Sequence, residues 1–221
     1  MESTLSPIEV RVLACLIEKS LSTPEYYPLT LNALTMACNQ KSNRDPIMQL
    51  SDQDAVRALD SLRDRRLAWV VTLSGSRVPK YRHHMEDVYP LILPQLAVLC
   101  ELMLRGPQTV GELRTHAGRL CSLTDTTEVQ SILQQLMAWA GGPLAAVAPR
   151  RAGQREERYA HLLGGVEAVE TESALTPAEP ARLTVMAEND RIAALEIKVA
   201  SLEDECARLK AQFADFASQF K

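Results

Sequence analysis

The chain has 221 residues, of which 46 % are hydrophobic and 24 % charged, and these fractions are typical of a globular protein. No run of about 18 apolar residues occurs, and the N-terminus has no secretory-signal pattern, so no membrane helix is expected and the protein is predicted to be cytoplasmic. The net charge of −4 argues weakly against nucleic-acid binding, but residues 41–82 hold nine basic and five acidic side chains.

Three helices are the first predicted elements. Ser6, followed by proline and then by Glu9, forms a capping-box pattern that begins the first helix. A second helix is predicted over residues 30–39, and a third from residue 51 or 52 to residue 66. The apolar side chains of the third helix that are expected to face the core are Val56, Leu59 and Leu62.

Two β-prone stretches follow the third helix and predict a hairpin. Residues 68–73, AWVVTL, form the first strand, Ser-Gly-Ser supplies the turn, and residues 77–84, RVPKYRHH, return as the second strand. Pro79 lies within the second stretch. Because proline cannot donate a ladder hydrogen bond, it indicates an edge strand.

The same series of elements occurs a second time along the chain. VRVLACLI matches LAVLCELM at an offset of 86 residues, and TLNALTMAC matches TVGELRTHA at an offset of 79. The third helices, DQDAVRALDSL and TTEVQSILQQL, align with Val56 on Val129 at an offset of 73. Two further strands are expected after the second of these helices, with RAGQREE as the wing between them.

Three helices and a hairpin, present twice, predict a fold class that is mainly α with small β-hairpins. We expect two tandem winged-helix domains plus a C-terminal coiled-coil helix. The predicted boundaries are 1–85 and 86–163 for the winged-helix domains, 164–181 for a linker rich in Glu, Ala, Pro and Gly, and 182–221 for the coiled-coil helix.

Specific segments of the chain also resemble a known family. LSPIEVRVLACLIEK, TPEYYPLTLNALTMACNQKSNRDP and the paired wings are similar to the YceH-like family of uncharacterised bacterial proteins. The resemblance covers about residues 1–163. It implies a tandem winged-helix fold and no particular activity, since the family supplies no catalytic motif to carry over.

Basic side chains in loops and wings are the candidates for DNA contact, because such positions commonly meet the DNA backbone. The third helix of the first copy exposes Arg57 among several aspartates, whereas that of the second copy exposes neutral glutamines that could read base edges. Both faces are equally compatible with ordinary solvated helix surfaces. The candidate DNA-binding residues are Lys41, Arg44, Arg57, Arg77, Lys80, Arg82, Gln130, Gln134, Arg150, Arg151 and Arg155.

A heptad stripe marks the last segment of the chain. β-Branched residues at the a position with leucine at d favour a parallel two-stranded coiled coil, so self-association is expected. An amphipathic helix docked on its own winged domains is the alternative. The candidate dimerisation residues are Ile192, Leu195, Val199, Leu202, Cys206 and Leu209.

Sequence motifs of enzymes and metal sites are missing. No G-x-S-x-G, glycine-rich phosphate loop or H-E-x-x-H occurs, and the five cysteines form no C-x-x-C pair. We therefore expect no catalysis, no cofactor and no metal, and we expect the cysteines to be reduced.

The leading hypothesis is a dimeric, non-enzymatic, cytoplasmic protein that binds double-stranded DNA as a transcriptional regulator or nucleoid-associated factor. The alternative is a protein-interaction adaptor with winged-helix shape and no DNA contact.

Overall fold

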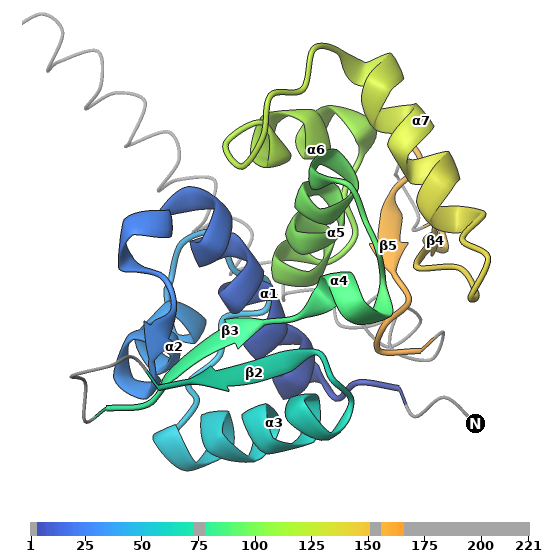
Figure 1. Cartoon of the computed structure of the whole chain (residues 1–221). Helices are drawn as coiled ribbons and strands as arrows, with labels where there is room; N and C mark the ends of the chain where they lie inside the picture. Colours follow the sequence, from blue (N-terminus) through green and yellow to red (C-terminus); the bar gives the residue numbers. More distant parts are fainter. Residues whose placement is uncertain (1–3, 73–77, 151–155, 166–221) are drawn as a thin grey trace, which may run out of the picture. The chain divides into compact units, whose positions relative to one another are not determined.

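The computed structural model describes residues 4–72, 78–150 and 156–165, all within one compact unit that spans residues 1–174. The described residues are mainly helical, with seven α-helices and two small antiparallel sheets (Figure 1), as the sequence predicts. None of these helices combines the length and the apolar character needed to cross a membrane. The predicted coiled-coil helix, with all its candidate dimerisation residues, lies outside the described residues.

The first copy contains three principal helices and three strands. In chain order its elements are α1 (Pro7–Ser22), a short 3₁₀ helix η1 (Pro24–Tyr26), β1 (Leu29–Thr30), α2 (Leu31–Cys38), α3 (Asp52–Asp64), β2 (Ala68–Val71) and β3 (Lys80–His83). The predicted capping box is present at the start of α1. The Ser6 hydroxyl accepts a hydrogen bond from the Glu9 N–H, and the Glu9 carboxylate accepts one from the Ser6 N–H.

The sheet of the first copy has the strand order β1-β3-β2, and both pairings are antiparallel. β3 is therefore the central strand, and the prediction of an edge strand from Pro79 is wrong. The two-residue strand β1 pairs with the other side of β3, and no local sequence pattern announces it. Pro79 is compatible with this arrangement because it lies just before the first residue of β3, where its missing N–H leaves the ladder intact.

The second copy repeats this order after a connecting helix, α4 (Met85–Val88). Its elements are α5 (Leu93–Arg105), α6 (Val110–Ala117), α7 (Thr126–Met137), β4 (Ala145–Val147) and β5 (Tyr159–His161). β4 and β5 pair antiparallel. A single bridge between Gln108 and Tyr159 takes the place that the β1–β3 pairing has in the first copy.

The third helices of the two copies align at an offset of 74 residues rather than the predicted 73. Their N-caps are Ser51 and Asp125. At this offset Ala55 corresponds to Val129, and both are completely buried, whereas Val56 is 37 % exposed. The prediction that Val56 faces the core is therefore wrong. The match of valine with valine favoured the wrong register, because alanine is a weaker indicator of a core position.

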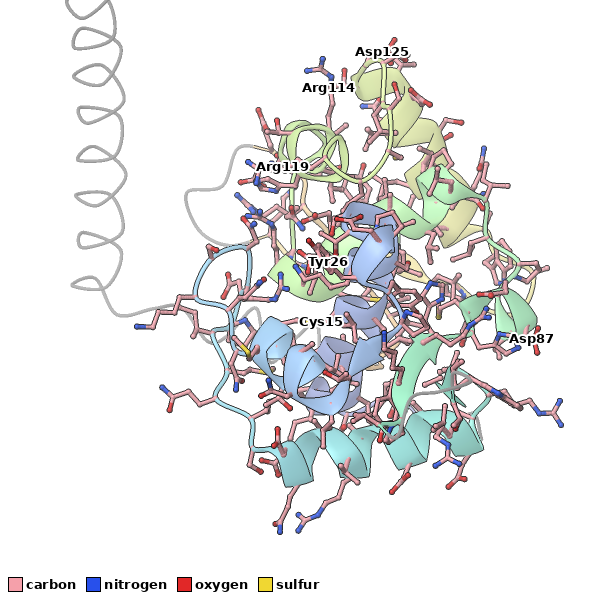
Figure 2. The ribbon with its side chains drawn as sticks, turned by 60° about the vertical axis from the view of Figure 1, so that its left-hand side comes forward. Cys15, Tyr26, Asp87, Arg114, Arg119 and Asp125 are labelled. Carbon is pink, nitrogen blue, oxygen red and sulfur yellow. The ribbon has the colours of Figure 1, made fainter. Side chains whose placement is uncertain are left out.

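The two copies pack together through α1 and α5 around one shared hydrophobic core. The Cys100 thiol donates a hydrogen bond to the Ala14 carbonyl oxygen at 3.4 Å, and these residues are equivalent under the offset of 86. Contact between equivalent positions is typical of a two-fold relation, so the copies pair as subunits do in a symmetric dimer. Both views place α3 and α7 at opposite ends of the unit (Figures 1 and 2).

Candidate nucleic-acid interface

The exposed face of α7 is neutral and rich in hydrogen-bonding groups. The helix begins at Asp125, whose side chain accepts a hydrogen bond from the Glu128 N–H at 2.9 Å. Apolar side chains fix its orientation, since its buried residues are Val129, Ile132, Leu133 and Leu136. The side chains that this orientation leaves exposed include Thr127, Gln130, Ser131 and Gln134. The α7 face, as we call these four residues, can therefore donate and accept hydrogen bonds without carrying charge.

The corresponding face of α3 has a different chemical character. Under the offset of 74 residues, Gln130 and Gln134 correspond to Val56 and Asp60. Asp60 is exposed and pairs with Arg63 at 3.1 Å. An exposed carboxylate at the centre of such a face repels phosphate. The second copy is therefore better suited than the first to approach a nucleic acid.

Two arginines that the sequence analysis did not single out lie beside α7. Arg114 is on α6 and Arg119 follows that helix, and both side chains are exposed. Figure 2 shows them at the same end of the unit as Asp125, the N-cap of α7. Under the offset of 79 their counterparts in the first copy are the neutral Thr35 and Gln40. The signal that could have revealed these cations is their position around the turn between the last two helices, where helix-turn-helix proteins meet the DNA backbone.

The candidate cations of the first copy are dispersed rather than gathered. Lys41 and Arg57 are exposed, and Lys80 is half-buried at the start of β3. Arg82 pairs with Glu86 at 2.9 Å, so part of its charge is neutralised locally. Arg77 lies outside the described residues.

Arg44 occupies a buried position, which removes it from the candidate interface. Its side chain has no exposed surface, and its Nη2 lies 2.6 Å from Glu18 Oε2. The same guanidinium donates hydrogen bonds to the Ala37 carbonyl oxygen and to Gln40 Oε1. The prediction that Arg44 contacts phosphate is therefore wrong. Its carboxylate partner lies 26 residues earlier in the chain, where local sequence could not reveal it.

The second wing contributes less positive charge than its sequence suggests. Arg150 pairs with Glu157 at 3.0 Å across the wing. The Arg158 guanidinium donates two hydrogen bonds to the Glu112 carboxylate, both 2.9 Å long. This ion pair links the residue before β5 to the start of α6. Arg151 and Arg155 lie outside the described residues.

Histidine, cysteine and acidic side chains are not gathered into a metal site. Within residues 4–72, 78–150 and 156–165 no group of three or more of them could hold a metal ion. The two adjacent histidines share only the Glu86 carboxylate, which lies 3.4 Å from His83 Nδ1 and 3.6 Å from His84 Nδ1, and their other ring nitrogens have different neighbours. His83 Nε2 lies 3.0 Å from the Ser20 hydroxyl, and His84 Nε2 lies 2.7 Å from Asp87 Oδ2.

Comparison with known proteins gives the chain many full-length relatives. A family model described as a protein of unknown function, DUF480, matches residues 5–154. A UPF0502 protein of Geotalea uraniireducens is 53 % identical over 222 residues, and one of Geobacter sulfurreducens is 52 % identical over 221 residues, with 100 % of each chain covered in both cases. A UPF0502 protein of Vibrio atlanticus is 45 % identical over 215 residues, which cover 96 % of this chain and 97 % of the relative.

Proposed function

The chain belongs to the DUF480 family of proteins of unknown function, the YceH-like family that its sequence resembles, and on that premise we propose that it is a non-enzymatic DNA-binding protein. Each copy has the order of a winged helix, with three helices followed by a hairpin. In such folds the third helix enters the major groove, and the preceding helix and turn meet the backbone. Applied to this chain, the rule assigns base contact to α7 and phosphate contact to α6 and the residues after it.

The proposal is carried by the position of Arg114 and Arg119 at the end of the unit where α7 begins, together with the neutral α7 face on that helix. Glutamine can pair with adenine through two hydrogen bonds in the major groove. Gln130 and Gln134 are both exposed on α7. Arginine supplies the charge that a phosphate requires. The first copy has no comparable combination on its third helix, so the second copy is assigned the main contact.

A tail-mediated dimer completes the proposed function. One α7 face with two flanking arginines gives weak binding, because non-specific affinity grows with the number of phosphates neutralised. A coiled coil over residues 182–221 would join two such units and raise the avidity through effective concentration. We therefore propose a cytoplasmic transcriptional regulator or nucleoid-associated factor that acts as a dimer.

Hydrogen exchange with and without duplex DNA tests which copy makes contact. In the full-length protein at low salt, peptides that cover residues 110–137 should exchange more slowly when a random-sequence duplex is added. Peptides that cover α3 serve as the internal control and should change little. Protection confined to α3, or no protection anywhere at a concentration where the duplex is in excess, would contradict the proposal.

A protein-interaction adaptor is the second candidate, and the surface of α3 favours it. Val56 is 37 % exposed on this helix, and Met36 on α2 is 65 % exposed. Asp60 and Asp64 add exposed carboxylates to the same helix. Such a surface fits a protein partner better than a nucleic acid. The adaptor function predicts no binding to duplex DNA even at low salt.

A further inference from the structure

Two thiols of the first copy lie close together in its interior. Cys15 on α1 and Cys38 at the end of α2 have no exposed surface, and the two thiols are near enough for each to shift the pKa of the other. Arg11 lies one turn before Cys15 on α1, and its Nη1 donates to the Cys38 carbonyl oxygen at 3.4 Å. Arg11 and Cys15 therefore share the face of α1 that α2 covers. Figure 2 shows Cys15 within the body of the unit.

Positive charge is in excess around this thiol pair. Arg11 is 1 % exposed, its Nε has no hydrogen-bond partner, and its Nη2 donates to the Pro46 carbonyl oxygen at 2.7 Å. Its ordered partners are thus carbonyl groups and not a carboxylate. Arg44, the second buried guanidinium of this region, is paired with Glu18. A buried cation without a counter-charge favours the thiolate form of a neighbouring cysteine.

Nearby carboxylates do not cancel this excess. Asp45 is exposed to solvent, where its field is screened. Glu101 pairs with Arg105, with its Oε2 3.0 Å from the Arg105 Nε. Glu18 is paired with Arg44 and Lys19, so Arg11 remains a buried cation without an ion pair among the described residues.

Cys100 provides a matched contrast at the seam between the copies. Like Cys15 it has no exposed surface, but burial and the adjacent Glu101 carboxylate raise its pKa well above the ordinary value. Burial and the Glu18 carboxylate also raise the pKa of Cys15, yet the interaction with the Cys38 thiol and the charges of Arg44 and Arg11 outweigh both effects and leave the pKa lowered. The pKa values of two equally buried thiols are thus shifted in opposite directions by their surroundings.

We propose that Cys15 and Cys38 form a modification site at which hydrogen peroxide generates an intramolecular disulfide. The Cys15 thiolate attacks one peroxide oxygen, an S–O bond forms as the O–O bond breaks, and the departing hydroxide takes up a proton to become water. The Cys38 sulfur then attacks the Cys15 sulfenic acid, the S–S bond forms, and a second water leaves with the Cys38 proton. One peroxide is reduced by two electrons as the two thiols are oxidised.

Access to the pair requires local opening, because neither thiol has exposed surface. The segment between α2 and α3 is held to α1 through Arg11, which donates to the Pro46 carbonyl oxygen, and through the ion pair of Arg44 with Glu18. Loops held by a few hydrogen bonds open far more often than whole domains unfold. The reaction is therefore expected to be slower than that of an exposed thiol and to proceed in the folded protein.

The test uses the full chain with Cys121→Ser and Cys206→Ser, so that only the three buried thiols remain. The protein is treated with hydrogen peroxide, blocked under denaturing conditions and digested, and its peptides are identified by mass spectrometry. The expected product is a peptide pair that joins Cys15 to Cys38 and is released by a reducing agent. In the Cys38→Ser variant, Cys15 should instead be trapped as a sulfenic acid by a dimedone probe.

A comparison within the same molecule keeps the test independent of whether a variant folds. Alkylation of the untreated protein with a slow thiol reagent should label Cys15 faster than Cys100. Equal labelling of the two, a disulfide that includes Cys100, or no oxidation while the protein remains folded would each overturn the proposal. None of these measurements depends on DNA binding.

Discussion

Arginine residues in this protein take roles that depend on their burial. Arg44 is buried against Glu18 and supports the interior of the first copy, whereas Arg114 and Arg119 lie exposed beside α7. Sequence analysis assigned Arg44 to the surface because its partner is distant in the chain. It missed Arg114 and Arg119 because its candidates in the second copy came from the third helix and the wing, and not from the helix before them. Residue type could therefore be read from the sequence, but the environment of each charge could not.

The ion pair between Arg44 and Glu18 should contribute strongly to stability. Replacing Arg44 with alanine removes the buried partner of the Glu18 carboxylate and leaves it only the partly exposed Lys19, and loss of a buried partner costs about 3–5 kcal/mol. The matched control is Arg63→Ala, because Arg63 and Asp60 form an exposed pair with side chains 48 % and 62 % exposed. That change should cost at most about 1 kcal/mol. Equal urea midpoints for the two variants would contradict this assignment.

A buried histidine should make stability depend on pH. Burial lowers the pKa of His161 to about 4 from its ordinary value of 6.5, and its Nδ1 has no hydrogen-bond partner. Between those pH values the unfolded state binds a proton that the folded state does not. The free energy of unfolding should therefore fall as the pH drops from 6.5 to 4, by about 3 kcal/mol in total.

The His161→Phe variant isolates this contribution. Its free energy of unfolding, measured by urea titration at several pH values, should decline less than that of the wild type below pH 6.5. The exchange removes the titrating group and keeps an aromatic ring at the position. Parallel curves for the two proteins would show that His161 does not carry the effect. His84→Gln is the control for loss of a more exposed histidine.

At the scale of elements, helix starts could be predicted and strand pairings could not. Ser6, Thr30 and Ser51 cap α1, α2 and α3, as the sequence patterns indicate, because capping chemistry is local. The two-residue strand β1 was missed because only its partner β3 defines it. The register of α3 was wrong by one residue because an exposed valine resembled a core residue.

Substitutions on α3 and α7 test the corrected register. Leu59 and Leu133 are each 1 % exposed and correspond to each other at the offset of 74, so truncation of either to alanine should cost about 2–5 kcal/mol. Val56→Ala removes an exposed side chain and should shift stability by less than about 1 kcal/mol. Thermal or urea unfolding measures all three. A larger loss of stability for Val56→Ala than for Leu59→Ala would contradict the offset of 74 and support the offset of 73.

At the scale of the whole molecule, the shared core joins the two copies into one unit. Their hydrophobic cores are continuous, and the Cys100–Ala14 contact lies at equivalent positions of α1 and α5. The sequence repeat predicted two similar parts, but their mode of packing depends on the paired helix faces and could not be read from either copy alone. We infer that the second copy carries the DNA surface while the first copy supports it.

Oligomeric state should depend on the heptad stripe, which lies outside the described residues. Leu195→Asp combined with Leu202→Asp places charges in the predicted seam and should yield monomers by analytical ultracentrifugation. The unfolding transition of residues 4–165 should be retained, because these residues contain a hydrophobic core of their own. A wild-type protein that sediments as a monomer at micromolar concentration would instead favour the docked helix.

The most direct test is the salt dependence of binding to a random-sequence duplex, measured by fluorescence anisotropy with the full-length protein. Wild type should bind at low salt, and log K should fall linearly with log salt by about 0.9 for each phosphate neutralised. The Arg114→Ala/Arg119→Ala variant should bind more weakly and show a slope smaller by about 2. Lys41→Ala/Arg57→Ala, the control in the first copy, should change the slope much less. Absence of wild-type binding at low salt, or an unchanged slope after loss of Arg114 and Arg119, would contradict the account.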